Sequence, residues 1–282
     1  MKGPAGKTHD KPAYRLYKGE GEEIRYDETV DRLARADVVL FGEVHDNRLV
    51  HQLQFEITRD LFSAGRGDMA LGAEMFEADN QLILDEYLAG LILHRHLVAE
   101  AKVWNNYETD YRGLVDFAKE NTLRFIATNV PRRYANLVAR EGIEALERLS
   151  EEAKQYSAPL PISVDLATPG YREMMGMNLD MGHRMRMRPE NVVAAQAVKD
   201  ATMAHFVMKN LVAEGLFIHY NGVYHSQNYG GIYWYLKKAD PRLSVLTISS
   251  VEGEHTGFQR EYQGLGDFIL VVPEGAKDLP AE

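Results

Sequence analysis

The chain has 282 residues, of which 45% are hydrophobic and 26% charged, a composition typical of a globular protein with a sizeable core. The formal net charge of −10 argues against nucleic acid as a partner, because phosphate binding requires a basic surface. The absence of cysteine excludes a disulfide framework, a thiolate metal site and a cysteine nucleophile. No stretch approaches the roughly 20 apolar residues that a membrane-spanning helix needs.

The first 25 residues are polar, and we expect 1–25 to form a flexible N-terminal arm. A short helix is expected over 26–36. Six short apolar runs follow, each bounded by turn-forming residues, and most are rich in valine, isoleucine, leucine or phenylalanine: 37–41, 69–73, 124–128, 216–220, 243–248 and 268–272. Runs that are nearly continuously apolar are typical of strands that are buried on both faces.

Helical stretches separate most of these runs: 48–64, 79–121 with breaks, 131–157, 190–214 and 227–239. Strands that alternate with helices predict an α/β fold, with a mainly parallel central sheet flanked by helices. The interval between the third and fourth strands is too long for one crossover. We therefore expect a helical insertion around 131–190, which forms a lid or a small lobe. No repeat or low-complexity linker divides the chain, so 26–282 is predicted to be a single domain.

Ionisable residues follow four of the predicted strands. Glu43 and His45 come after the first strand, Glu74 after the second, Arg132 after the third and His225 after the fourth. In open parallel sheets, ligands bind just outside the carboxyl ends of the strands. A carboxylate close to a buried strand is also costly unless it is paired or bound to a metal. These positions predict one pocket, built around Glu43, His45, Glu74 and His225.

Two kinds of chemistry are open to these four residues. The segments 42–45 and 222–225 share the pattern Gly-x-x-His, in which glycine allows a sharp turn. Two imidazoles together with Glu43 and Glu74 could hold a divalent metal with an open coordination position. They could equally form a metal-free acid–base set, in which His45 or His225 is the base and a glutamate orients it.

Further candidates lie outside this set. Arg132 and Arg133, at the expected start of a helix, suit a carboxylate or phosphate group, although surface ion pairs are the alternative. Tyr134 is either a phenolate ligand or an inward-packing helix residue. Asp200 lies at the edge of the apolar stripe of helix 190–214. We expect it to pair with one of these arginines or with a site histidine, unless it is solvated.

The segment 171–187 begins at Tyr171 and holds six methionines, among them Met181, with His183 and several arginines between them. Thioether sulfur is a soft ligand that suits Cu(I) or haem iron, and the arginines could pair with haem propionates. The alternative is a flexible apolar lid or a contact between subunits.

Several short motifs occur in order along most of the chain. They are Phe-Gly-Glu-Val-His-Asp-Asn (41–47), Gly-Ala-Glu-Met-Phe (72–76), Trp-Asn-Asn-Tyr-Glu-Thr-Asp-Tyr (104–111), Asn-Val-Pro-Arg-Arg-Tyr (129–134), Ala-Gln-Ala-Val-Lys-Asp-Ala-Thr-Met-Ala (195–204) and Asn-Gly-Val-Tyr-His (221–225). With these motifs the chain resembles the ChaN-like haem-binding uptake proteins. Those proteins belong to a wider group that includes Tiki-type metalloproteases and erythromycin esterases.

The resemblance implies an α/β core with helical additions and an exported bacterial protein, periplasmic or an outer-membrane lipoprotein, that takes part in haem or iron uptake. It also implies a shared pocket at the matching positions, which are Glu43, His45, Glu74, Arg132 and His225. Tyr134 and Tyr224 are the tyrosines within the matched motifs. Both are candidates for the axial ligand of haem, because a tyrosine can hold ferric haem iron.

The leading hypothesis is therefore a haem- or iron-binding protein of bacterial uptake. The first alternative is a hydrolase of ester or peptide bonds that uses the same pocket, with or without a divalent metal. The second is a copper-binding protein that uses the methionine-rich segment. The expected partners are haem or a metal ion, and a second copy of the chain in a homodimer. Contact with a membrane is expected only through a lipid anchor.

Overall fold

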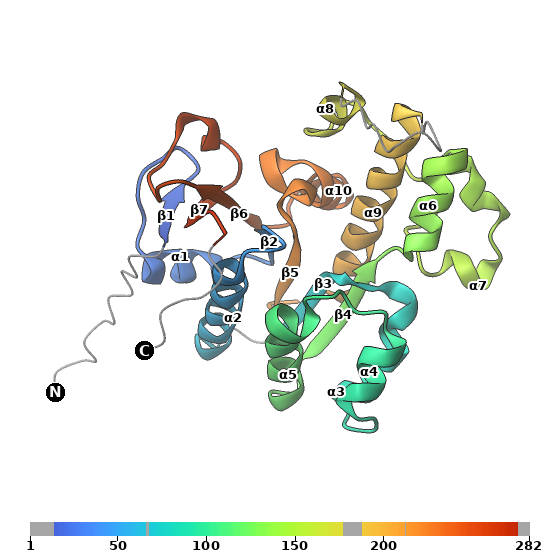
Figure 1. Ribbon diagram of the computed structural model, residues 1–282, viewed down its shortest axis with the longest axis horizontal. Coiled ribbons are helices and arrows are strands. Elements are labelled where there is room, and N and C mark those ends of the chain that lie inside the picture. The colour runs from blue at the N-terminus through green and yellow to red at the C-terminus, as the bar shows by residue number, and fades with distance from the viewer. Residues whose placement is uncertain (1–13, 66–67, 177–187, 212, 276–282) are drawn as a thin grey trace.

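A seven-stranded sheet forms the centre of the protein (Figure 1). We describe it from a computed structural model that covers residues 14–65, 68–176, 188–211 and 213–275. The strands lie in the order β1-β7-β6-β2-β5-β3-β4. Their bounds are β1 Arg15–Lys18, β2 Val38–Glu43, β3 Met69–Glu77, β4 Arg124–Asn129, β5 Leu216–Gly222, β6 Val245–Gly253 and β7 Phe268–Pro273.

All neighbouring strands from β2 to β7 pair in parallel, which confirms the predicted α/β class. β2 lies between β5 and β6, with Val39 opposite Ile218 on one side and Leu246 on the other. The chain leaves β2 towards β3, but later crosses from β5 to β6 on the opposite side of β2. Such a change of direction opens a crevice at the carboxyl ends of the strands.

Helices cover both faces of the sheet (Figure 1). Their bounds are α1 Tyr26–Leu33, α2 Arg48–Ser63, α3 Gln81–Leu88, α4 His94–Glu100, α5 Arg112–Glu120, α6 Arg132–Glu141, α7 Glu151–Lys154, α8 Tyr171–Gly176, α9 Pro189–Asn210 and α10 Gly231–Ala239. One hydrophobic core packs the helices α1, α2, α3, α4 and α5 on one face of the sheet. A second core packs α9 and α10 on the other face. Within the described part of the chain, no helix is both long and apolar enough to span a membrane.

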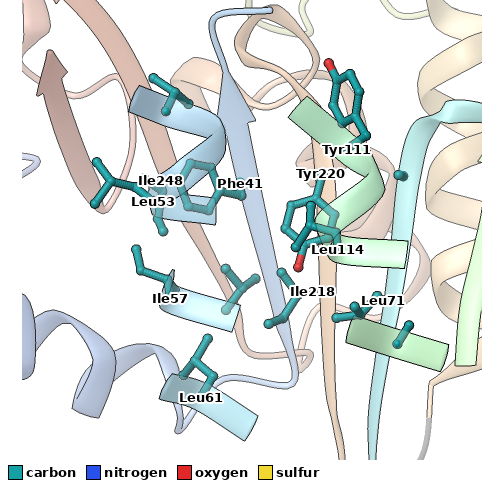
Figure 2. Close-up of a cluster of buried hydrophobic side chains, with 14 of the residues drawn as sticks. Phe41, Leu53, Ile57, Leu61, Leu71, Tyr111, Leu114, Ile218, Tyr220 and Ile248 are labelled. Carbon is teal, nitrogen blue, oxygen red and sulfur yellow. The ribbon is translucent and has the colours of Figure 1, made fainter. Parts of the chain in front are cut away.

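The larger core explains why the strands are apolar without alternation. Figure 2 shows Phe41 and Ile248 from the sheet facing Leu53 and Ile57 of α2, all of them buried. Burying a side chain of this size contributes about 1.5–3 kcal/mol. The neighbouring residues of β2, such as Leu40, point to the opposite face and pack in the second core. Both faces of each central strand are therefore apolar.

The region between β4 and β5 differs in detail from the prediction. The helical stretch expected over 131–157 is interrupted, because Gly142 has a φ of 90° and ends α6. A 3-10 turn and the short α7 follow. These elements pack on α9 and share a small core with it, so the described part of the insertion forms a lobe beside the sheet.

The N-terminal arm expected over 1–25 is wrong for its second half. Arg15–Lys18 forms β1, which pairs antiparallel with β7 at the edge of the sheet. Leu16 and Tyr17 are buried there. The strand has only four residues and two charged ends, so its sequence carries little apolar pattern, and pairing with β7 is what orders it.

Candidate functional site

A cavity of about 610 Å³ opens at the carboxyl ends of β5, β2 and β6, where the order of the strands predicts a crevice. The strands run further than the sequence suggested: Glu43 and Gly222 are the last residues of β2 and β5, and Glu74 lies within β3. The lining comprises Glu43, Val44, His45, Asp46, Gly222, Val223, Tyr224, Gln227, Ser250, Val251, Glu252, Glu261, Tyr262 and Leu265.

Glu43 is a buried carboxylate at the floor of the cavity, and its oxygens accept several hydrogen bonds. Oε1 accepts from Nδ1 of His45 at 2.9 Å and from the hydroxyl of Tyr111 at 2.5 Å. Oε2 accepts from the amide of Gln54 at 2.6 Å. Burial opposes ionisation, but the hydrogen bond from His45, the nearby His51 and the other donors outweigh it and lower the pKa of Glu43.

His45 is the half-exposed member of the site. Its side chain is 45% exposed and packs edge-on against Trp104, with 5.0 Å between the ring centroids. The hydrogen bond with Glu43 raises the pKa of His45, although partial burial opposes this. The bond occupies Nδ1 and leaves Nε2 facing the cavity beside Gly222. A histidine held in this way can give or take a proton at Nε2.

His225 is buried between two carboxylates. Nε2 lies 3.1 Å from Oε1 of Glu74, and Nδ1 is hydrogen-bonded to Asp200. The other oxygen of Asp200 accepts a hydrogen bond of 2.6 Å from the hydroxyl of Tyr171. Burial disfavours the imidazolium, but Glu74 and Asp200 prevail and raise the pKa of His225 to about 10. His225 is thus a cation at neutral pH and cannot act as a base there.

Gly222 lies where the Glu43–His45 pair meets the Glu74–His225 pair. Its backbone N–H donates to Oε2 of Glu74 at 2.8 Å. This bond and the charge of His225 lower the pKa of Glu74 well below its usual range, against the effect of burial. A Cβ atom on Gly222 would lie 2.7 Å from Nε2 of His45 and 3.5 Å from Oε2 of Glu74. Only glycine therefore allows this approach, by which segments distant in the chain meet at the carboxyl ends of the strands.

A family model matches the sequence that forms this site. Residues 29–236 match the family described as haem-binding uptake, Tiki superfamily, ChaN, which is most of the chain. The chain belongs to this ChaN family. No curated protein matches it.

Several solved structures are similar to this ChaN-family chain, and the first of them described here shows the same fold. ChaN of Campylobacter jejuni, described in a structure of cofacial haem binding, is 17% identical, with 92% of this chain and 96% of that chain covered and a TM-score of 0.69. A Bacillus cereus protein is 12% identical (87% and 90% covered, TM-score 0.47). RRSP, a MARTX toxin effector domain from Vibrio vulnificus, is 18% identical (90% and 40% covered, TM-score 0.44).

The four residues predicted as metal ligands do not gather into one cluster in the described part of this ChaN-family chain. Within the described residues, no three His, Asp or Glu side chains are placed to hold a metal ion. The reason lies in their partners: Glu43 is held by Tyr111, Gln54 and His45, and Glu74 by Gly222 and His225. The carboxylates thus form two acid–histidine pairs instead of the one four-ligand cluster that the sequence predicted.

The arginines predicted to bind an anion are occupied by ion pairs. Arg132 pairs with Glu77, and Arg133 pairs with Asp79 at 2.6 Å and stacks on the ring of Tyr134. Tyr134 is itself buried in the core of the small lobe. None of the three residues predicted here lines the cavity, since α6 lies beyond β3 and β4 at the far side of the sheet.

The remaining candidates have different outcomes. Tyr224 lines the cavity and is 77% exposed. Asp200 and Tyr171 are buried behind His225, so Asp200 pairs with a site histidine, one of the partners expected for it, and not with an arginine. Met181 and His183 lie outside the described residues.

Three contributors to the site were missed in the sequence. Gln54 and Tyr111 donate to Glu43, yet each lies within a helical pattern in which it looks like an ordinary core or surface residue. Ser250 lines the cavity from β6. The six-residue apolar run 243–248 stopped before it, so only the continuation of β6 to Gly253 reveals its place.

Proposed function

We propose that this protein binds haem for uptake at the mouth of the cavity above β5, β2 and β6, with Tyr224 as the ligand of the iron. Membership of a haem-binding uptake family supports haem as the ligand. The exposed Tyr224 on the cavity lining is the observation that supports this position. A phenol oxygen is an established type of axial ligand for haem iron.

The environments of the two candidate tyrosines favour Tyr224. Tyr134 is buried, and its hydroxyl accepts a hydrogen bond of 3.2 Å from Arg133. The iron of a haem would have to displace Arg133 from that oxygen. Tyr224 stands in solvent beside the half-exposed His45, whose imidazole is a second possible axial ligand.

We expect Tyr224→Phe to weaken hemin binding by about tenfold or more, a loss of about 1.4 kcal/mol, because the iron loses its anionic oxygen ligand. The measurement is titration with hemin followed by the Soret band, whose position should also shift in the variant. Tyr134→Phe is the matched control and should bind like the unmodified protein. Equal affinity and spectra for Tyr224→Phe and the unmodified protein would remove Tyr224 from the site.

A second candidate function is hydrolysis of an ester or amide bond at the same cavity. The supporting observation is the pair of acid–histidine units, Glu43–His45 and Glu74–His225–Asp200. His45 would remove a proton from water through Nε2, while Glu43 fixes its orientation. His225, whose two ring nitrogens are held by Glu74 and Asp200, would fix the position of Glu74 on the other side of Gly222. No step in this scheme requires a metal ion.

For the hydrolase candidate, His45→Ala is expected to reduce turnover by at least about 100-fold, the usual contribution of a general base. The assay is a panel of activated esters and short peptides, with and without a chelator. His205→Ala, on the far face of α9, serves as the control and should leave turnover unchanged. If the unmodified protein hydrolyses nothing in the panel, or if His45→Ala retains full turnover, the candidate fails.

Uptake of haem implies a location outside the cytoplasm, and we propose an exported protein that pairs with a second copy when haem is bound. Cofacial haem binding is described for the C. jejuni protein, and haems that lie face to face would fit between two such copies. Sedimentation of the protein with and without hemin measures the pairing, and cell fractionation measures the location.

A further inference from the structure

The lining of the cavity is acidic. Four acidic side chains contribute to the lining, and the described lining residues include no lysine or arginine. Glu43 is used within the site, but Asp46, Glu252 and Glu261 come from three other segments: the β2–α2 turn, β6 and the turn at Arg260–Tyr262. Carboxylates around a cleft concentrate their field inside it. The cavity therefore attracts cations and repels anions.

A buried hydroxyl of the same lining lacks a partner in the described part of the chain. Ser250 is 1% exposed, lies on the cavity lining, and its Oγ has no hydrogen-bonding partner among the described residues. Buried polar atoms in folded proteins are normally paired, so each exception requires an explanation. A ligand that donates a hydrogen bond to Oγ would supply the missing partner. We call Asp46, Ser250, Glu252 and Glu261 the acidic wall.

The carboxylate of Glu252 is held in a fixed position within the acidic wall. Its Oε1 accepts from the side-chain amide of Asn47 at 2.7 Å and from the backbone N–H of Gly275 at 3.2 Å. Both bonds use the same oxygen, and Oε2 takes part in neither. Because Asn47 is the N-cap of α2, the position of Glu252 is tied to a helix and not to a free loop. The acceptor is thus already oriented before a ligand arrives.

We propose that the acidic wall binds the ammonium group of a small organic ligand. An ammonium carries a positive charge and several N–H donors, which match the carboxylates and the unpaired hydroxyl of Ser250. Anionic groups, haem propionates among them, are disfavoured at the acidic wall.

This inference deepens the proposed function, because it rests on the cavity being a ligand site and names the class of compound that the cavity prefers. For the hydrolase candidate, the substrate would be an ester or amide that also carries an amine. For haem binding, the propionates would lie away from the acidic wall. Binding of an amine is measurable without haem and without turnover, so it is tested separately.

The test is calorimetric titration of the full chain with phenethylamine, phenethyl alcohol and phenylacetate, which share a ring and differ in charge. We expect the amine to bind about tenfold more tightly than the alcohol, and the carboxylate to bind most weakly. Glu252→Gln should weaken binding of the amine about tenfold and leave the alcohol unchanged. Glu254→Gln, an exposed acid on the same segment but outside the lining, is the control.

Glu261→Gln provides a second variant, since Glu261 is exposed and its replacement leaves the core intact. It should weaken binding of the amine about threefold. This variant tests the proposal if Glu252→Gln fails to fold. Equal affinity for amine and alcohol, or amine binding that neither variant weakens, overturns the proposal. If amine binding is found without any hydrolysis, the acidic wall is supported and the hydrolase candidate fails. Hydrolysis of neutral esters with no preference for the amine overturns the acidic wall alone.

Discussion

Replacing His225 with leucine is expected to lower the free energy of unfolding by about 3–5 kcal/mol at pH 6. The imidazolium is the cation between the buried carboxylates of Glu74 and Asp200. Leucine would leave both acids without it, so one must take up a proton or remain as an uncompensated buried charge. Urea denaturation followed by circular dichroism measures the change.

His205→Leu is the control for this result. His205 lies on α9, as Asp200 does, but its pKa is lowered by burial and by Lys209, so it does not act as a buried cation. Its replacement should cost less than about 1 kcal/mol. A loss below that value for His225→Leu as well would show that His225 does not balance the two carboxylates.

The second large effect is a loss of stability at alkaline pH. The pKa of His225 is raised from 6.5 to about 10 in the folded protein, because Glu74 and Asp200 outweigh the effect of burial. Its contribution is therefore complete below pH 6.5 and is lost as the pH rises from 6.5 to 10. Each pH unit in this window removes about 1.4 kcal/mol. We expect the free energy of unfolding to fall by about 2–3 kcal/mol between pH 8 and pH 10.

Urea titrations at pH 8, 9 and 10 check this expectation. His205→Leu should show the same fall as the unmodified protein, whereas His225→Leu should lack the part that comes from the imidazolium. At acid pH the free energy of unfolding changes in the opposite direction and falls as the pH falls. The lowered pKa values of Glu43 and Glu74 contribute stability above about pH 4.5 that is lost as the pH falls further. A flat profile between pH 8 and pH 10 would mean that His225 is neutral in the folded protein.

Much of the candidate site could be predicted because the residues just before each strand end form an apolar run that is visible in the sequence. The apolar runs before Glu43, Glu74 and His225 identified buried parallel strands, and parallel strands bring their carboxyl ends to one edge. The partners of these residues could not be predicted in the same way. Gln54 and Tyr111 reach Glu43 from a helix and a turn whose own patterns carry no sign of it.

Arg132 shows that following a strand is not enough to place a residue in the cavity. It also follows a strand, β4, yet β4 lies at the edge of the sheet, three strands from β2. Its guanidinium pairs with Glu77 and does not line the cavity. Position after a strand is a local property of the sequence. The distance of that strand from the crevice beside β2 depends on the order of strands in the sheet.

The sequence by itself determined the class of fold, most of the strands and helices, and the family, because these depend on runs and motifs that are contiguous in the chain. Only the tertiary structure decided how the acids are used: Glu43 with His45, Glu74 and Asp200 with His225, and Glu252 with Asn47. Those pairings join residues as far as 205 positions apart. A buried charge takes whichever partner the packing brings near, and that is a property of the whole fold.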